Sequence, residues 1–443
     1  MGVSRKAILE RMFYAGLRAV DPGAAVWRHV RRVQDTLRVG YCAYDLRFTR
    51  RVVVVGAGKA AAPMARALEG ILGDRLTGGV VVVKYGHRLP LERIRMLEAG
   101  HPLPDENGLR GAEAVLQELE GCTEDDLAIS VFSGGASALL PAPRSPIGLA
   151  DKQSTTQLLL ECGATIREIN AIRKHLSRLK GGGLALAAYP ATVVSLFLSD
   201  VVGDSLDVIA SGPTVADPST FGDCIDILER YSLVSKVPGR VLEILHRGLN
   251  REESETVKPD HPALRRVQNV LVGNNRSALF AARDEAGSLG YWPLVLTSQL
   301  QGEAREVAGF IAAVAREILA SDHPVRPPAC ILAGGEPTVT VKGDGKGGRA
   351  QELALAAAMA IDGLDGVSLL CAGTDGTDGP TDAAGAFADG ATCSRARQIG
   401  LAPADHLARN DSYPFFKALG DLFVSGPTRT NVMDLVCMLV ERG

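Results

Sequence analysis

Lysine and arginine side chains stand beside glycine-rich turns in both halves of this 443-residue sequence. Lys59 lies in the segment GAGK, which follows the apolar run 52–55 and precedes a helical pattern. Arg349 ends a second glycine-rich stretch, which begins after Glu336. Such a turn brings backbone N–H groups and a long cation within reach of an anion. The pattern predicts phosphate chemistry, in which positioned cations neutralise the charge of the transferring group.

Three carboxylates stand together in the segment TDGTDGPTD, directly after the apolar run 367–372. They belong to Asp375, Asp378 and Asp382. One or two carboxylates together with substrate phosphates are the usual ligands of Mg²⁺. Aspartates in turns also accept hydrogen bonds from their own backbone, so each of them has a structural alternative. Asp375 and Asp378 are the candidate metal ligands.

Two further segments could bind an anion. Ser133, Gly134 and Gly135 follow the apolar run 127–132 and open a helical pattern, although a plain turn explains them equally well. Arg173 and Lys174 begin a segment rich in basic side chains, which could hold a carboxylate or a phosphate or simply face solvent.

The first glycine turn also fits the pattern G-x-G-x-x-A, with Gly56 and Gly58 as its glycines. A dinucleotide-binding fold carries an acidic residue at the end of the next strand, but this chain has Lys84 there. An NAD(P)-dependent reductase that acts on hydroxypyruvate or tartronate semialdehyde is therefore the alternative function. A regulatory protein that only binds ligands is a second alternative.

The elements that must position these residues alternate along the chain. Short apolar runs lead into small polar residues and then into helical patterns of 10–15 residues, which predicts parallel sheets covered by helices. Ligands of such sheets bind beyond the carboxyl ends of the strands, where the candidate residues stand. The charged segment 246–264 is the expected linker between domains 1–245 and 265–443.

Composition limits the function classes. The net charge of −3 and the 5% aromatic content disfavour a nucleic-acid-binding surface. Eight cysteines without a C-x-x-C pair are typical of reduced thiols in a cytoplasmic protein. No apolar run approaches the ~20 residues of a membrane helix, so we expect no membrane association.

Taken together, the motifs resemble the glycerate 2-kinase family, in which a DUF4147 domain precedes a MOFRL domain. The matching segments span Val52 to Leu435 and include VVVVGAGKAAAPMA, SGGASALL, NAIRKHLSRLKGGGLA, LSDVVGDSLDVIASGPTVADPSTF, GGEPTVTVKGDGKGGRAQELALA, AGTDGTDGPTDAAGA and GPTRTNVMDL. The resemblance implies a Rossmann-like three-layer N-terminal domain with a mostly parallel sheet. It also implies an α/β C-terminal domain with the MOFRL region at about 328–440, and an active-site cleft between the two.

The implied reaction is the phosphorylation of D-glycerate at its 2-hydroxyl by ATP and Mg²⁺, in a cytoplasmic monomer or homodimer. The polar positions that the family pattern marks are Lys59, Asp200, Glu336, Arg349, Asp375 and Asn431. Among these, Lys59, Asp200, Arg349 and Asp375 are the expected catalytic residues. The sequence departs from the family pattern at Ala350 and Arg429, which puts the details of ligand contact there in question.

Overall fold

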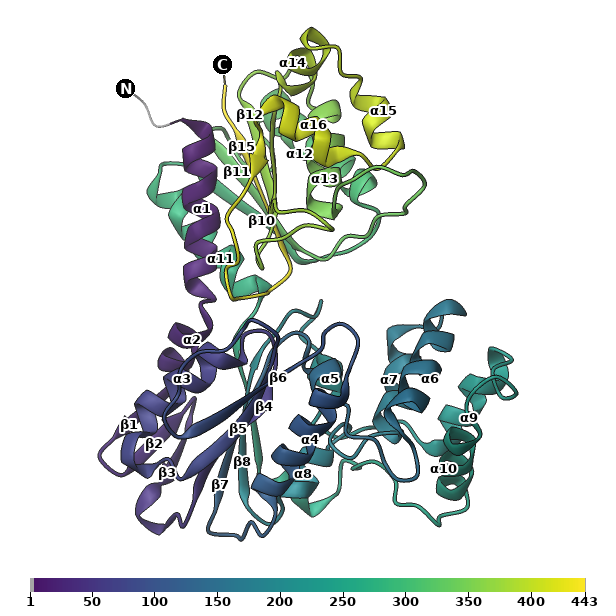
Figure 1. Cartoon of the computed structure of the whole chain (residues 1–443). Coiled ribbons are helices and arrows are strands. Elements are labelled where there is room, and N and C mark those ends of the chain that lie inside the picture. The colour runs from purple at the N-terminus through teal and green to yellow at the C-terminus, as the bar shows by residue number, and fades with distance from the viewer. Residues whose placement is uncertain (1–3, 443) are drawn as a thin grey trace. The chain divides into compact units, whose positions relative to one another are not determined.

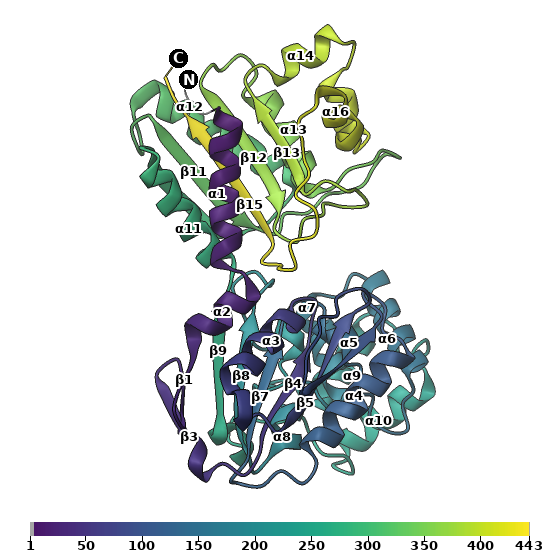
Figure 2. The same cartoon turned by 60° about the vertical axis from the view of Figure 1, so that its left-hand side comes forward.

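The computed structural model describes residues 4–442, which form two compact units (Figures 1 and 2). Unit 1 comprises residues 1–21, 200–203 and 273–443. Unit 2 comprises residues 22–199 and 204–272. Unit 1 is therefore formed by three separate segments of the chain, and unit 2 by two.

Unit 2 is built on a six-stranded sheet with the strand order β6-β5-β4-β7-β8-β9. The strands are β4 (Val52–Ala57), β5 (Gly78–Lys84), β6 (Ile94–Ala99), β7 (Leu127–Phe132), β8 (Thr192–Leu198) and β9 (Val267–Gly273). The four pairs from β6 to β8 are parallel. β4 and β7 are buried along their whole length, as expected for strands covered on both faces.

Helices cover both faces of this sheet. Figure 1 shows α3 (Ala61–Leu72) on one side and α4 (Glu106–Leu119) with α8 (Gly183–Ala188) on the other. The short helix α5 (Ala136–Leu139) follows β7. The remaining regular elements of the edge and loops are α2 (Pro22–His29), β1 (Val30–Val33), β2 (Thr36–Val39), β3 (Cys42–Asp45), η1 (Leu46–Phe48), η2 (Gly73–Arg75), η3 (Ile209–Ser211) and η4 (Pro262–Arg266).

A group of four helices packs beside the sheet around its own apolar cluster, which includes Ile172, Phe221 and Leu245. These helices are α6 (Leu149–Glu161), α7 (Ile166–His175), α9 (Phe221–Arg230) and α10 (Gly239–Leu249). The side chain of Thr165 caps α7, and that of Thr220 caps α9, each in a capping box with the acid three residues later. These caps fix where α7 and α9 begin.

The strand order of unit 2 creates a switch point. From β4 the chain first moves outward through β5 and β6, and then returns to place β7 on the other side of β4. In open α/β sheets a ligand binds beyond the carboxyl ends of the two strands at such a point. The turns after β4 and β7 carry Lys59 and Ser133-Gly134-Gly135, respectively.

Unit 1 contains a mixed six-stranded sheet with the order β10-β11-β15-β12-β13-β14. Its strands are β10 (Trp292–Leu300), β11 (Ala329–Gly335), β12 (Val367–Gly373), β13 (Gly385–Asp389), β14 (Leu422–Phe423) and β15 (Asp434–Val440). β15 inserts between β11 and β12 and is antiparallel to both. Among the described strands of this sheet, β10–β11 is the one parallel pair, so the sheet is mixed, and the second half of the chain is an α/β unit as expected.

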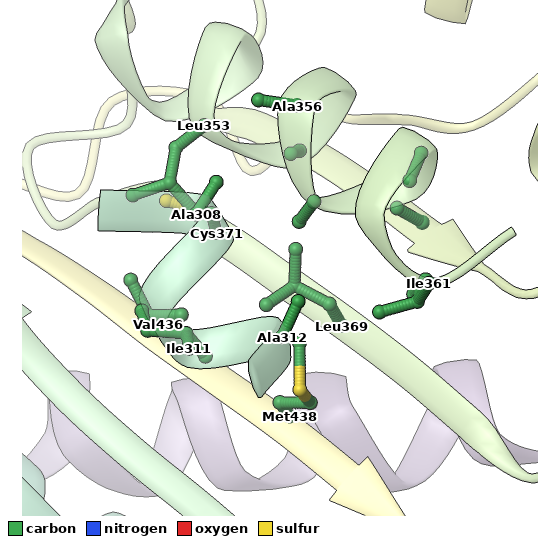
Figure 3. Packing of buried hydrophobic residues seen from close by; sticks show 14 of the residues in the cluster. Ala308, Ile311, Ala312, Leu353, Ala356, Ile361, Leu369, Cys371, Val436 and Met438 are labelled. Atoms are coloured by element: carbon green, nitrogen blue, oxygen red, sulfur yellow. The ribbon is translucent and has the colours of Figure 1, made fainter. Parts of the chain in front are cut away.

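Small residues allow the helices to approach this sheet closely. Ala308 and Ala312 of α12 (Ala304–Ser321) pack with Leu353 of α13 (Arg349–Ala360) over Leu369 and Met438 of the sheet (Figure 3). The other helices of unit 1 are α1 (Arg5–Ala19), α11 (Asn275–Ser288), α14 (Thr392–Gln398), α15 (Pro403–Ala408) and α16 (Ser412–Leu419). α1 contacts α11 and β15, so the first and the last regular element of the described residues belong to unit 1.

The division of the chain lies elsewhere than the sequence predicts. The expected linker 246–264 lies inside unit 2, and the change to unit 1 comes after residue 272. Hydrogen bonds hold the segment 246–264 to the rest of unit 2. The Val257 N–H donates to the Gly181 carbonyl, and the Glu255 carboxylate accepts from the Phe221 N–H. Charged residues without apolar neighbours look like a linker in sequence, but here ion pairs and backbone hydrogen bonds hold them in place.

Two sequence-based expectations concern the whole chain. In the described part of the chain, no helix is both long and apolar enough to cross a membrane. The eight cysteines are all free thiols, and six of them are buried.

Candidate functional site

The two turns at the switch point of unit 2 touch each other. The Lys59 N–H donates to the Gly134 carbonyl at 2.9 Å, and the Ala60 N–H donates to the Ser133 hydroxyl at 2.9 Å. Gly58 has a φ of +145°, and a Cβ atom there would lie 2.1 Å from the Ser133 oxygen. Only glycine permits this approach.

The first turn does not offer its N–H groups to an anion, contrary to the prediction from its glycine pattern. The amides of Gly58, Lys59 and Ala60 are all bonded, to the Val82 carbonyl and to the second turn. In the second turn, by contrast, the amides of Gly134 and Gly135 have no acceptor among residues 4–442. What remains of the first turn is the half-buried side chain of Lys59.

Positive charge gathers at these strand ends. Burial, together with the smaller effect of the nearby cations Lys59 and Lys84, lowers the pKa of His101 to about 4. His101 is therefore a neutral imidazole at pH 7, and it packs against Gly135. An anion that enters here meets lysines without an accompanying imidazolium.

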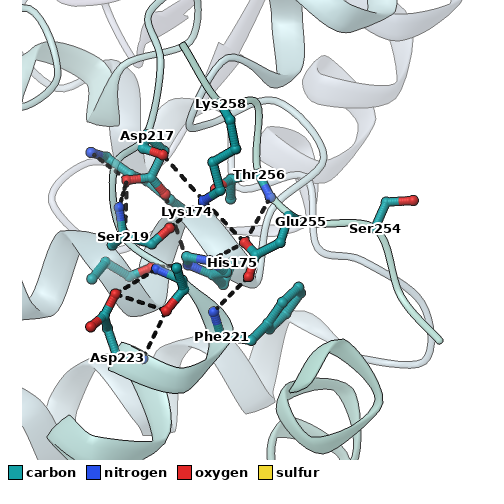
Figure 4. Close-up of polar contacts among 12 residues, drawn as sticks. Lys174, His175, Asp217, Ser219, Phe221, Asp223, Ser254, Glu255, Thr256 and Lys258 are labelled. Carbon is teal, nitrogen blue, oxygen red and sulfur yellow. Dashed lines mark hydrogen bonds and ion pairs between the residues drawn. The ribbon is translucent and has the colours of Figure 1, made fainter. Parts of the chain in front are cut away.

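Lys174 and the residues around it serve to hold the fold (Figure 4). The Lys174 ammonium is buried between Asp217, at 3.4 Å, and Asp207, at 3.6 Å. Next to it, the two ring nitrogens of His175 face the Ala171 carbonyl at 2.8 Å and the Glu255 carboxylate at 3.1 Å. The expectation that Lys174 binds a ligand therefore lacks support, because carboxylates of the protein already occupy it.

Glu255 joins this network to two other elements. Burial alone would raise the pKa of Glu255, but hydrogen bonds from His175, the Phe221 N–H and Lys258 lower it to about 2. The carboxylate is thus ionised at neutral pH and ties the 250–258 segment to α7 and to the start of α9. Lys174 and His175 thus fasten one face of α7 to the protein. The Arg173 side chain takes no part in these contacts.

The Arg173 side chain has no hydrogen bond or ion pair with the described residues, in contrast to that of Lys174. It lines a cavity of about 430 Å³ together with Lys152 and Lys180, two buried lysines that the sequence analysis did not select. Lys152 is hidden in a segment of ordinary helical composition. Lys180 could have been found, because it directly precedes the glycine triplet 181–183.

A second polar cluster lies in unit 1 around Arg349, the first residue of α13. Arg349 Nε donates to Asp434 at 2.7 Å and Nη1 donates to Glu336 at 2.6 Å. Glu336 follows β11 and Asp434 begins β15, so two neighbouring strands hold the guanidinium. Burial alone would lower the pKa of Arg349, but these two carboxylates raise it above its ordinary value.

Asp434 is a residue that the sequence analysis missed. Burial raises its pKa to about 7, and the attraction of Arg349 opposes this shift. The signal was present in NVMDLVCMLV, where one acid opens an otherwise apolar strand. A carboxylate at such a position is buried, and a buried charge needs a partner.

The two candidate metal ligands differ in how many of their oxygens are in use. Both oxygens of Asp378 accept N–H groups, from Ala350 at 3.1 Å and from Gln351 at 2.8 Å, so Asp378 caps α13. Asp375 uses only Oδ1, which accepts the N–H and hydroxyl of Thr377. Among residues 4–442 no group of three or more His, Cys, Asp or Glu side chains could hold a metal ion by itself.

Asn431 brings Asp200 into the same cluster, since its Nδ2 donates to Asp200 Oδ2 at 3.2 Å. Both residues belong to unit 1, because Asp200 is part of the short segment 200–203. A cavity of about 280 Å³ is lined by Arg349, Asp375, Asn431 and Asp434 among others. Unit 1 therefore gathers five of the six residues that the family pattern marks: Asp200, Glu336, Arg349, Asp375 and Asn431. Lys59 lies in unit 2.

The chain thus has two α/β units: unit 1 carries an arginine–carboxylate cluster at its strand ends, and unit 2 carries cations at a switch point. Two family profiles match the chain: the domain of unknown function DUF4147 over residues 8–246, and the MOFRL family over residues 329–434. The chain belongs to this DUF4147–MOFRL family.

Relatives with names are similar over nearly the whole chain. A glycerate 2-kinase of Pyrococcus horikoshii is 42% identical over 97% of this chain and 96% of its own length. The crystal structure of a glycerate kinase from Thermotoga maritima superposes with a TM-score of 0.88 at 41% identity, covering 98% of this chain and 99% of that one. An Agrobacterium vitis protein that is named as a hydroxypyruvate reductase is 42% identical over 99% of this chain and 95% of its own length.

Proposed function

We propose that this protein is a glycerate 2-kinase, which transfers the γ-phosphoryl group of ATP to the 2-hydroxyl of D-glycerate. The observation that carries the proposal is the Arg349 cluster, where a paired guanidinium, the half-free carboxylate of Asp375 and the amide of Asn431 line one cavity. The named glycerate kinases among the relatives support the same reaction.

In this reaction the 2-hydroxyl oxygen attacks the γ-phosphorus, the bond to the β-phosphate oxygen breaks, and ADP leaves. The hydroxyl proton must move to a base, and Asp200 is our candidate. Asn431 orients the Asp200 carboxylate, whereas Glu336 is already engaged by Arg349. Arg349 is held by two carboxylates and can keep its remaining N–H donors directed at a phosphoryl oxygen without moving.

The Mg²⁺ that such a reaction uses fits Asp375 better than Asp378. Asp375 Oδ2 has no hydrogen bond with the described residues, whereas backbone N–H groups hold both oxygens of Asp378. A single protein carboxylate is sufficient where substrate phosphates supply further ligands. Bound there, the cation would withdraw charge from the transferring phosphoryl group.

The reductase alternative meets two obstacles in unit 2. A dinucleotide would have to accept hydrogen bonds from the first glycine turn, whose amides are already bonded within the protein. The next strand ends in Lys84, where a ribose-binding acid is expected. Neither feature impedes phosphoryl transfer.

One pair of assays tests the proposal. The first measures ADP formation from ATP and D-glycerate with Mg²⁺, and the second measures NAD(P)H oxidation with hydroxypyruvate. Phosphorus NMR of the product distinguishes 2-phosphoglycerate from 3-phosphoglycerate. Reduction of hydroxypyruvate without ADP formation would overturn the proposal, and 3-phosphoglycerate as the only product would overturn the assigned position.

Two substitutions test the assigned cations. Lys59→Ala and Arg349→Ala are each expected to lower kcat by roughly 10²-fold or more, because a cation that meets transition-state charge affects the chemical step. Arg349→Lys should restore little, since an ammonium cannot replace a forked guanidinium. A variant with kcat near the wild-type value and a changed KM for glycerate would remove that residue from the catalytic set.

A cytoplasmic location and a monomeric or homodimeric state stay predictions, as does the absence of a nucleic-acid partner.

A further inference from the structure

The cavity beside α7 in unit 2 concentrates cations to a degree that the fold alone does not require. Its volume is about 430 Å³, and its lining includes His101, Gly135, Lys152, Arg173 and Lys180. The two lysines are only 7% and 5% exposed. Buried lysines are rare unless a counter-charge compensates them.

These three cations have no such partner among residues 4–442. No carboxylate oxygen of the described residues lies within 4 Å of a side-chain nitrogen of Lys152, Arg173 or Lys180. Lys152 Nζ donates to the Pro141 carbonyl at 2.5 Å, and Lys180 Nζ donates to the Ser137 carbonyl at 2.9 Å.

Backbone carbonyls therefore explain part of the placement of the lysines. An ammonium group has three N–H donors, however. Lys152 uses one of them, and Lys180 uses two, because it also donates to the Leu140 carbonyl. Each lysine therefore keeps at least one N–H donor for a ligand. No contact explains the placement of the Arg173 side chain, because none of its five N–H donors bonds to the described residues.

The same arrangement costs the empty protein free energy. Burial lowers the pKa of Lys152 and of Arg173, and it lowers the pKa of Lys180 to about 7. Each cation also repels the others, since Arg173 contributes to the shift at both lysines. An anion between them would reverse both effects, because it supplies the missing counter-charge at short range.

We propose that this cavity binds an oxyanion, with Arg173, Lys180 and Lys152 as its ligands. Under the proposed function, on which its biological identity rests, the oxyanion is the carboxylate of glycerate or a phosphate of the nucleotide. A guanidinium and two ammonium groups match both, since each presents several oxygens with one charge or more.

The surroundings suit a small anionic ligand. Gly135 lines the cavity, and its N–H has no acceptor among residues 4–442. Pro102, Leu103 and Leu160 form an apolar part of the wall, and Leu103 and Leu160 are also exposed to solvent, at 71% and 56%. The network around Lys174 and His175 anchors the other side of α7 (Figure 4), so Arg173 is presented by a fixed helix.

Binding measured on the full chain tests the inference directly. Isothermal titration uses three probes separately: D-glycerate, inorganic phosphate and ADP. Arg173→Gln is compared with Arg167→Gln, which removes the same charge from an exposed position of the same helix. Lys180→Gln is the second test variant, because its amide can still donate to the carbonyls that Lys180 now contacts.

We expect Arg173→Gln and Lys180→Gln each to raise the dissociation constant of at least one probe tenfold or more, and Arg167→Gln to change it less than twofold. A loss confined to D-glycerate assigns the carboxylate, and a loss confined to ADP assigns the nucleotide phosphate. If the wild-type protein binds none of the three probes, or if both test variants bind all three as Arg167→Gln does, the inference is wrong.

These results are independent of the proposed reaction. Absence of ADP formation by a wild-type protein that binds D-glycerate or phosphate through Arg173 would reject the kinase and keep the oxyanion site. Normal ADP formation by Arg173→Gln, with unchanged KM for both substrates, would reject the site and keep the kinase.

Discussion

Replacing Asp434 by asparagine tests whether a buried carboxylate positions Arg349 for catalysis. Asp434 accepts hydrogen bonds from Arg349 Nε at 2.7 Å and from Nη2 at 3.2 Å. The substitution keeps the size of the side chain and removes its charge. Only the half-exposed Glu336 would then hold the guanidinium by an ion pair.

The magnitude follows from those two contacts. A hydrogen bond to a charged group contributes about 1.5–3 kcal/mol. If that free energy keeps the guanidinium directed at the phosphoryl group, its loss lowers kcat by about 10- to 150-fold, since about 1.36 kcal/mol corresponds to a factor of ten. The KM for glycerate should change much less, because Asp434 acts through Arg349.

The pH profile provides a second readout. Since burial raises the pKa of Asp434 to about 7, the carboxylate gains its charge as the pH rises from 6 to 8. The Arg349 ion pair strengthens in the same direction, so wild-type kcat should rise over this range. Asp434→Asn cannot titrate at this position and should lack the step.

The matched control is Asp421→Asn, which removes another buried aspartate paired with an arginine in unit 1. Asp421 bonds Arg395 at 2.8 Å and does not line the Arg349 cavity. Steady-state ADP formation measures kcat, with circular dichroism and Tm as folding controls. If folded Asp434→Asn keeps kcat within twofold of wild type, or if Asp421→Asn lowers kcat as much, the positioning role is refuted.

Three further predictions concern the other contacts. Asp375→Asn should lower kcat about 10²-fold with little change in Tm, whereas Asp378→Asn should cost about 1–2 kcal/mol of stability through the lost cap of α13; equal losses of kcat at equal Tm would contradict the distinction. Gly58→Ala should prevent folding or soluble expression, because its Cβ would overlap Ser133, and a stable, active variant would disprove that packing. D-glycerate keeps one charge between pH 6 and 9, so deprotonation of Lys180 should weaken its binding by up to tenfold per pH unit above about pH 7, and a pH-independent dissociation constant would exclude carboxylate binding there.

Much of the fold could be predicted because its signals are local. The apolar runs at 52–55, 127–132 and 192–198 are all strands of one sheet, since continuous apolar residues are needed where helices cover both faces. The small polar residues that follow these runs do stand at strand ends. Neither the antiparallel insertion of β15 nor the return of the chain to unit 1 leaves such a local signal, because both depend on long-range pairing.

Candidate residues could be selected from the sequence where they stand in a recognisable motif. Arg349 and Asp375 stand in recognisable glycine-rich segments, and the structure brings them to one cavity. Asp434 and Lys152 were missed, because their meaning comes from burial and from neighbours distant in sequence. For the same reason, composition could not separate Arg173 from Lys174.

The difference between Arg349 and Arg173 leads to an opposite kinetic expectation for each. Arg349 is held by Glu336 and by Asp434, and these two carboxylates offset its charge in the ground state once Asp434 is ionised. It therefore attracts a resting substrate weakly and contributes mainly when further negative charge develops on the transferring group, which is an effect on kcat. The Arg173 side chain has no counter-charge in the described part of the chain, so any oxyanion that enters its cavity gains the full interaction already in the ground state.

Its loss should therefore appear mainly as a higher KM at nearly constant kcat, the signature of binding shared by ground and transition states. Steady-state kinetics of Arg173→Gln beside Arg349→Ala measures both quantities. The opposite result would be a lower kcat at unchanged KM for Arg173→Gln and a higher KM at unchanged kcat for Arg349→Ala. It would show that an ion pair in the free protein does not determine whether a cation acts in substrate binding or in the chemical step.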